Sequence, residues 1–183
     1  MGLSLGGVFE DWAIGRPKVP FNFFPKSDHL WPRRKRICRL TKSVWLMLEH
    51  PEWQPKATEQ EASMSPYNPP RDWANILRQM IADSLVWEKR PPKVGIWTTI
   101  RTPMDSNGID GFITFTKGNG NIYVLTFDLT IGKKGDFKSD ILIKWKAPWR
   151  EPNWHLSPRS QERFAKYAEA IALYYTNGRC LRL

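Results

Sequence analysis

The sequence predicts an α/β fold in which a mixed β-sheet is flanked by helices. Two segments, 72–90 and 157–176, carry apolar residues at helical spacing. Short runs rich in β-branched and aromatic residues lie between them and after the second one, and such runs are typical of strands. From residue 72 the predicted order is helix, three strands, a fourth short run compatible with a strand, helix and strand.

Residues 1–71 predict an irregular N-terminal extension that precedes an α/β core at 72–183. Residues 1–36 are rich in Pro, Phe and Gly without a helix or strand period, and 51–71 reads as a Pro-rich linker. Between them, 41–50 predicts one short helix. The basic run "WPRRKRICR" indicates a phosphate-binding patch or nuclear-import signal, or else a solvated surface segment.

The first helix of the core is predicted to begin at Asp72, a good N-cap, and to end before the two prolines that follow residue 90. Its apolar face is formed by Trp73, Ile76, Leu77, Met80, Ile81 and Trp87. The last helix is predicted to have Ser157 as N-cap, Pro158 in the first turn and Asn177-Gly178 as its stop. Its buried face is predicted to comprise Phe164, Tyr167, Ala168, Ile171, Ala172 and Tyr175.

The predicted strands cover 94–102, 109–117, 122–131, 140–145 and 179–183. The second and third are separated by "GNGN", whose Asn-Gly pair favours the positive backbone angles of a hairpin turn.

The composition is strongly basic, which bears on the partner. Lys and Arg number 28 against 18 Asp and Glu, a formal net charge of +10. A surplus of this size favours a polyanion, nucleic acid above all and less often an anionic membrane surface, and it leaves DNA and RNA equally open. No apolar run reaches the roughly 18 residues that span a bilayer, and the first residues meet acidic side chains too soon for a signal peptide. We therefore expect a soluble, intracellular protein.

The spacing of cysteines and histidines argues against a zinc site or a Ser-His-Asp triad. The two cysteines, Cys38 and Cys180, are far apart, and His29, His50 and His155 are scattered. None belongs to a CxxC motif or a Cys/His cluster. We expect the histidines to be ordinary surface or interface residues.

An aspartate lies in each strand that flanks the "GNGN" turn, Asp110 near the start of one and Asp128 near the end of the other. If a three-residue loop is centred on Asn119, paired position numbers sum to 238, and the two aspartates lie opposite each other. A two-residue loop would place them on opposite faces. Facing carboxylates are destabilising unless a cation such as Mg²⁺ or Mn²⁺ lies between them; alternatively, each caps a strand end in solvent.

This order of elements, with an aspartate in each of two consecutive strands, resembles the PD-(D/E)XK restriction-endonuclease-like superfamily over residues 72–183. The resemblance implies an α-β-β-β-α-β core and a metal-dependent nuclease that cleaves phosphodiester bonds in nucleic acid. It implies that Asp110 and Asp128 hold Mg²⁺ or Mn²⁺. An acidic residue on the preceding helix would complete the site, with Asp83 the first choice and Glu88 the second.

The superfamily places a lysine two positions after the second acidic residue, where it helps to activate or orient the attacking water, but this chain has Thr130 there. No proline directly precedes Asp110 either. The cap-snatching endonucleases of segmented RNA viruses look similar in taking their lysine from further along the chain, and Lys133, Lys134 and Lys138 are available here. We predict that one of these, with Lys134 favoured, is catalytic; the alternative is that all three contact phosphates.

Basic side chains outside this motif are predicted to hold the nucleic-acid backbone. They are Arg33, Arg34, Lys35, Arg36, Lys144, Lys146 and Arg150. In "KWKAPWREPNW" tryptophans alternate with basic residues, which predicts either stacking on bases or a loop anchored in the core by its tryptophans.

Two alternative hypotheses place the protein in other functional classes. One is a non-catalytic nucleic-acid-binding or assembly protein that keeps a nuclease-like fold after losing its lysine. The other is a structural subunit of a larger ribonucleoprotein or viral particle, for which residues 1–71 would be the docking segment.

Overall fold

A computed structural model describes Lys18 and residues 36–54, 66–67, 69, 72–100, 102–130, 138–144 and 158–183. The helices are α2 (Arg36–Glu49), the 3-10 turn η3 (Pro51–Trp53), α3 (Asp72–Asp83), the one-turn α4 (Pro103–Ser106) and α5 (Pro158–Thr176). The strands are β1 (Lys93–Thr98), β2 (Gly111–Thr116), β3 (Ile122–Thr130), β4 (Ile141–Lys144) and β5 (Leu181–Arg182). None of the described helices is long and apolar enough to cross a bilayer.

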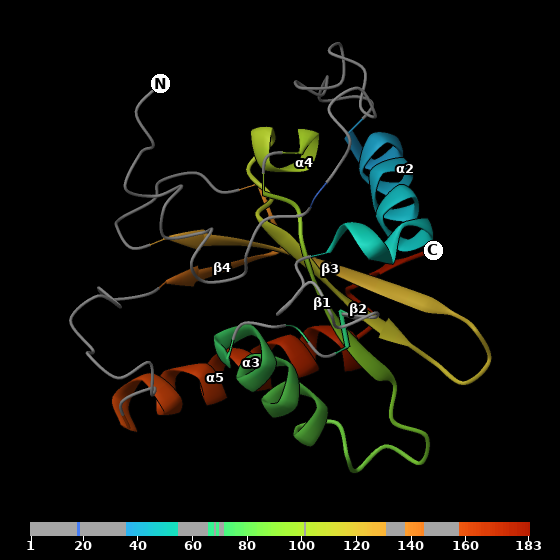
Figure 1. Ribbon diagram of the computed structural model, residues 1–183. Helices are drawn as coiled ribbons and strands as arrows, with labels where there is room; N and C mark the ends of the chain where they lie inside the picture. The colour runs from blue at the N-terminus through green and yellow to red at the C-terminus, as the bar shows by residue number, and fades with distance from the viewer. Residues whose placement is uncertain are drawn as a thin grey trace.

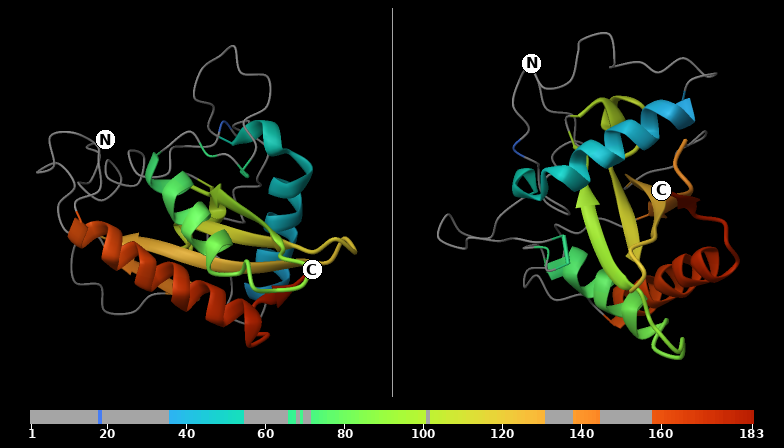
Figure 2. Two further views of the ribbon diagram at one scale, coloured as in Figure 1. Left: turned by 90° about the horizontal axis from the view of Figure 1, so that it is seen from below. Right: turned by 90° about the vertical axis from the view of Figure 1, so that its right-hand side faces the viewer.

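The sheet forms a middle layer, with α2 on one face and α3 and α5 on the other (Figures 1 and 2). β1, β2 and β3 pair antiparallel in chain order, and β4 lies parallel to β3. β5 runs antiparallel to β3 and pairs with its first residues, whereas β4 pairs with its last residues. The predicted α/β fold with a helix-flanked sheet is confirmed.

The β2–β3 hairpin has the register predicted for a three-residue loop. The pairs run from Gly111 opposite Phe127 to Thr116 opposite Ile122, so that position numbers in each pair sum to 238. The backbone N–H of Lys117 donates to Asn121 O at 2.9 Å and closes the loop. Gly120 has φ +84°, a conformation that L-residues with side chains rarely adopt. Of the two loop lengths that the sequence left open, the structure has the three-residue loop centred on Asn119.

Side chains alternate across the sheet and form two cores. On β3, Leu125, Phe127 and Leu129 face α3 and α5, whereas Val124 faces α2. The core under α2 also contains Val44, Met47, Trp53, Trp97, Met104, Ile109 and Phe112. Residues of the predicted N-terminal extension thus pack directly on the sheet.

The last helix agrees closely with its prediction, and the first does not. In α5 the predicted apolar face is buried or partly buried, Pro158 is the first residue, and Gly178 after the helix has φ +67°. The predicted helix 72–90 is wrong beyond Asp83, because Leu85 N–H donates to Ala82 O in a tighter 3-10 bond and Leu85 takes the core position. Trp87 is therefore 70% exposed rather than buried.

Two further elements differ from the sequence prediction. α2 begins at Arg36, five residues before the predicted start. α4 lies where no helix was predicted, although Thr102 accepts from Met104 N–H at 3.2 Å as an N-cap, and Pro103 follows it. The "Thr-Pro" pair is a usual helix start and was the available signal.

Candidate active site

The hairpin register brings Asp110 and Asp128 to neighbouring positions at one end of the sheet. The last printed pair of the hairpin is Gly111–Phe127, and Asp110 and Asp128 adjoin it directly at this end of the sheet. Asp128 lies in β3 four positions after Val124 and therefore shares its face, toward α2. Asp110 is 3% exposed and Asp128 is fully buried. Neither lies at a frayed strand end in solvent, so the structure contradicts that alternative.

Asp110 is fixed through its backbone and its side chain. Its N–H donates to Phe127 O at 3.0 Å, and its carbonyl oxygen accepts from Thr99 N–H at 2.9 Å. Its carboxylate Oδ2 accepts from Leu129 N–H at 2.6 Å. The carboxylate therefore reaches across to the backbone of β3 beside Asp128, and its position is set by both neighbouring strands.

Gly111 is required for this arrangement. A β-carbon at Gly111 would lie 2.3 Å from Phe127 Cζ and 2.5 Å from Trp97 O. Real β-carbons do not approach other atoms so closely. Only glycine at position 111 therefore allows β1 and the Phe127 ring to pack so near the backbone next to Asp110.

The connection from β1 to β2 is held by buried hydroxyl and amide groups that sequence reasoning did not single out. Thr99 Oγ1 donates to Ile109 O at 2.5 Å, and Thr102 Oγ1 donates to Thr99 O at 2.6 Å. Asn107 Nδ2 donates to Pro103 O at 2.7 Å. These bonds satisfy backbone oxygens within the loop, and they hold the loop that leads to Asp110 in one conformation.

Asp140 is a second residue that the sequence did not reveal. Its Oδ2 accepts from both the N–H and the hydroxyl of Thr126 at 2.7 Å, and its own N–H donates to Thr126 O at 3.1 Å. These bonds attach the residue just before β4 to the middle of β3.

The thiol of Cys180, close to the end of the chain, has a raised pKa. Burial, with the negative charge of Asp140 as a smaller cause, raises the pKa of Cys180 to about 12.

The structure does not bring Asp83 or Glu88 to the aspartate pair. Asp83 is exposed, and its Oδ1 accepts from Gln79 Nε2 at 2.8 Å. Glu88 lines a pocket together with residues of the β2–β3 turn, which is at the far end of β2 from Asp110. Figure 1 shows the end of α3 beside the loop that leads into β1, also away from α4. The acidic helix residue implied by the family resemblance is thus not found at Asp83 or Glu88.

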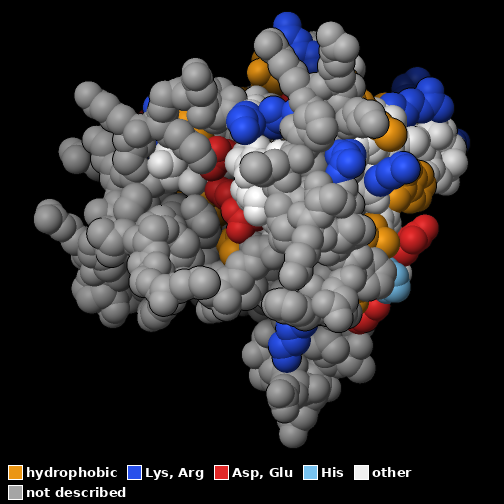
Figure 3. Space-filling model, turned by 90° about the horizontal axis from the view of Figure 1, so that it is seen from above, with side chains coloured by type: hydrophobic (Ala, Val, Ile, Leu, Met, Phe, Trp, Pro, Cys, Tyr) orange, Lys and Arg blue, Asp and Glu red, His pale blue; other side chains and the backbone are white. Residues whose placement is uncertain are grey.

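Two basic residues from distant parts of the sequence meet near the loop that precedes Asp110. The Arg36 guanidinium donates to Lys138 O at 2.6 Å. Lys138 Cβ lies 4.0 Å from the place that a β-carbon on Gly108 would occupy. Seen from above, acidic side chains on this face lie beside Lys and Arg side chains (Figure 3).

Lys144 is paired with Thr130, the position at which the family resemblance implies a lysine. In the parallel β3–β4 pair, Lys144 is the partner of Thr130, and Leu142 is the partner of Asp128. Paired residues point to the same face of a sheet, so Lys144 and Asp128 lie on one face, two positions apart along the strands. Lys144 is exposed, and its backbone N–H donates to the Tyr167 hydroxyl at 2.9 Å.

The remaining predicted site residues lie outside the described part of the chain. They are Arg33, Arg34, Lys35, Lys133, Lys134, Lys146 and Arg150.

Comparison of the chain with models of protein families, with curated proteins and with solved structures found no match.

Proposed function

We propose that the protein is a metal-dependent nuclease that cleaves phosphodiester bonds in nucleic acid, with Asp110 and Asp128 at its centre. The observation that carries the proposal is that two buried aspartates adjoin each other: the Asp110 carboxylate accepts from the N–H of Leu129, the residue that follows Asp128. Two neighbouring carboxylates favour a cation between them. The net charge of +10 supports a polyanionic substrate.

The order of elements supports a restriction-endonuclease-like core. α3, β1, β2, β3, α5 and β5 follow one another as helix, three strands, helix and strand. On this proposal β4 is an additional strand between β3 and α5, and α2 covers the face of the sheet that carries the aspartates.

The carboxylate pair fits Mg²⁺ or Mn²⁺. Such ions are held in nucleic-acid enzymes by one or two carboxylates together with waters and substrate phosphate. Within the described residues no group of three or more His, Cys, Asp and Glu side chains is placed to hold a metal, so the two aspartates are the protein ligands we assign. The ion would supply Lewis-acid polarisation of the scissile phosphate.

The chain's own cations would offset the charge that develops on phosphorus. Lys144 is the best placed of the described lysines, because it occupies the strand position beside Thr130 on the aspartate face. A lysine side chain spans about 6 Å, and neighbouring strands are about 4.7–4.9 Å apart. The ammonium of Lys144 can therefore reach across from β4 to the place where a lysine side chain at position 130 of β3 would begin. Lys138 and Arg36, beside the loop before Asp110, would contact flanking phosphates.

Replacing Lys144 by Met tests this assignment. We expect Lys144→Met to lower the cleavage rate by about a hundredfold while nucleic-acid affinity falls by less than about threefold. Lys138→Met serves as the matched control and is expected to weaken affinity modestly and leave the rate of the bound complex near that of the wild type. If Lys144→Met cuts at the normal rate, the catalytic lysine lies elsewhere.

A second candidate function is non-catalytic binding of nucleic acid. It is favoured by Thr130 at the position of the superfamily lysine and by the full burial of Asp128, which separates that carboxylate from solvent.

Manganese binding separates the two functions. For the nuclease we expect Mn²⁺ to raise the melting temperature and EDTA to reverse the rise. At a free Mn²⁺ concentration of a hundred times the dissociation constant, the free energy of unfolding should increase by about 2.7 kcal/mol. The same ion should support cleavage of single- or double-stranded nucleic acid. A protein that binds nucleic acid but shows neither a melting shift nor cleavage with Mn²⁺ or Mg²⁺ would be the non-catalytic binder.

A further inference from the structure

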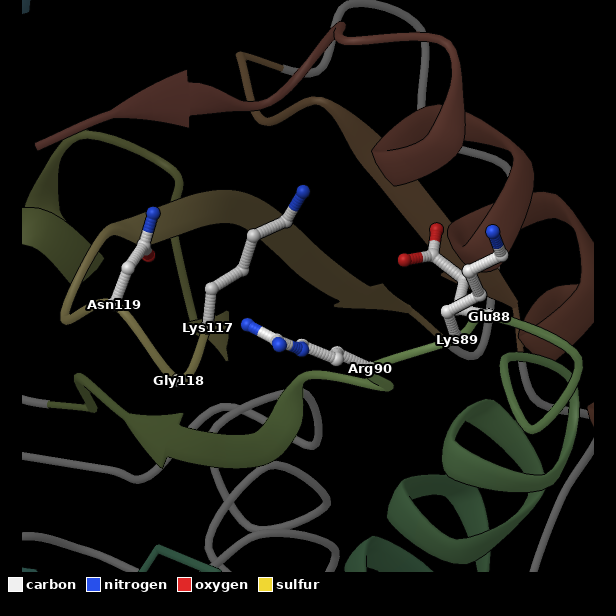
Figure 4. A pocket seen from close by; sticks show the side chains of 6 residues that line it. All are labelled: Glu88, Lys89, Arg90, Lys117, Gly118 and Asn119. Atoms are coloured by element: carbon white, nitrogen blue, oxygen red, sulfur yellow. The ribbon is translucent and has the colours of Figure 1, made fainter.

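A surface pocket of about 480 Å³ lies at the end of the sheet away from the aspartate pair. Its walls come from the loop after α3 and from the β2–β3 turn (Figure 4). The lining residues are Glu88, Lys89, Arg90, Lys117, Gly118 and Asn119.

The pocket has a surplus of positive charge. Three of its side chains are cationic and one is a carboxylate. Within the described parts of the chain, Lys89, Arg90 and Lys117 form no ion pair, since the ion pairs found there join His50 to Glu52 and Lys166 to Glu162. Like charges gathered around a concave surface repel one another, and a bound anion relieves that repulsion.

Lys117 is held in place by aromatic rings. Its Nζ lies 5.5 Å from the centre of the Tyr123 ring and 5.6 Å from that of Tyr175. The interaction with the Tyr175 side chain is the largest cause that raises the pKa of Lys117 above its ordinary value. Figure 4 shows the Arg90 side chain extending toward the turn that carries Lys117.

The turn leaves room for a ligand at its backbone. No atom lies within 4 Å of a β-carbon placed on Gly118. A phosphate oxygen can therefore approach this backbone closely, while the Arg90 guanidinium offers paired N–H donors that match phosphate geometry.

An anchored aromatic residue lies next to the pocket in the sequence. Trp87 precedes the lining residue Glu88, and its indole Nε1 donates to Ser84 O at 2.8 Å. This bond fixes the ring, yet the residue is 70% exposed. An exposed aromatic ring can stack on a nucleobase while cationic side chains hold its phosphate, and Trp87 is the exposed aromatic residue that directly precedes the lining residues in the chain.

We propose that this pocket binds the phosphate group of a nucleotide or nucleic-acid strand through Arg90 and Lys117, with Trp87 stacking on the attached base.

This site is separate from the proposed nuclease centre. Lys117 directly follows β2 and lies over Tyr175 of α5, whereas Asp110 directly precedes β2 at its other end. Lys117 lies seven positions after Asp110, a span of about 23 Å along an extended strand. The inference therefore does not depend on cleavage, and it is tested in EDTA, where metal-dependent chemistry is absent.

The test is a backbone-amide NMR titration of the whole chain in EDTA at about 50 mM salt. The probes are inorganic phosphate, adenosine 5′-monophosphate and a short single strand without terminal phosphates. We expect saturable shifts concentrated at residues 88–90 and 117–119. Shifts with the first two probes alone assign the site to free nucleotides or strand ends, and shifts with all three assign it to the strand backbone. Absence of saturable shifts at these residues overturns the proposal.

Variants sharpen the assignment. Lys117→Met and Arg90→Gln should each weaken phosphate binding by about tenfold. Arg179→Met is the matched control, because Arg179 also lies over a tyrosine, 5.6 Å from the Tyr174 ring, but does not line the pocket. An equal loss in Arg179→Met would show general charge attraction and overturn the site.

Trp87→Ala separates stacking from phosphate recognition. It should weaken adenosine monophosphate binding by at least about fivefold and leave inorganic phosphate binding unchanged. Unchanged affinity for the nucleotide would overturn the role of Trp87.

Discussion

Asp128→Asn is expected to reduce Mn²⁺-dependent cleavage by at least about 10³-fold, and Asp110→Asn to do the same. Each change keeps the shape of the side chain but removes one of the two negative charges that favour a cation. The amide oxygen of Asn at position 110 can still accept from Leu129 N–H, so that the strand contact at 2.6 Å is preserved. The rate is measured under single-turnover conditions, and the fold is checked by circular dichroism.

Asp83→Asn is the matched control for both variants. Asp83 is an exposed aspartate whose carboxylate bonds to Gln79, and the structure does not bring it to the pair. We expect this variant to retain cleavage and the Mn²⁺-dependent rise in melting temperature, and both aspartate-pair variants to lose them. If Asp83→Asn were as inactive as Asp128→Asn, the helix would contribute a ligand as the family resemblance implies. If Asp110→Asn and Asp128→Asn both cut normally, the proposed centre is wrong.

Gly111→Ala is expected to destabilise the fold by about 3 kcal/mol, at the upper end of the cost of overpacking. The added methyl group would lie 2.3 Å from the Phe127 ring and 2.5 Å from the backbone oxygen of Trp97. The backbone oxygen cannot rotate away as a flexible side chain would. For a chain of this size the change corresponds to a fall in melting temperature of roughly 6–12 °C.

Gly118→Ala supplies the control, because a methyl group there meets no atom within 4 Å and the residue is not among the described glycines with positive φ. Its stability should stay within about 0.5 kcal/mol of the wild type. Denaturant unfolding of the two variants measures the difference. Equal stabilities would mean that β1 and Phe127 can move apart at Gly111, and that the glycine does not fix the position of Asp110.

The hairpin was the part of the site that the sequence predicted best. Its register follows from the length of one local turn, and Asn119-Gly120 has the backbone freedom that such a turn needs. Once the register is fixed, Asp110 and Asp128 adjoin the last pair of the hairpin, Gly111–Phe127. α5 was likewise predictable, because its first proline, its apolar face and its terminal glycine are all encoded within one short segment. The predicted cap, Ser157, lies outside the described residues.

The first helix shows where local pattern fails. The spacing of apolar residues continues to Trp87, but the helix ends at Asp83 because burial of Leu85 and the path into β1 compete with further helical turns. This difference moved Trp87 to the surface and brought Glu88 to the pocket. Helical periodicity alone therefore misplaced both residues.

By itself the sequence determined the α/β class, the net positive charge and the presence of a hairpin with an aspartate in each flanking strand, since each depends on composition or on residues close together in the chain. Only the tertiary structure decided which strand lies beside the end of β3 and which distant basic residues meet near the loop before Asp110. Lys144 becomes the neighbour of Thr130 through a parallel strand pairing, and Arg36 meets Lys138 across 102 positions of sequence. Such contacts depend on how separate elements pack, because parallel pairing and helix docking have no local turn that fixes their register.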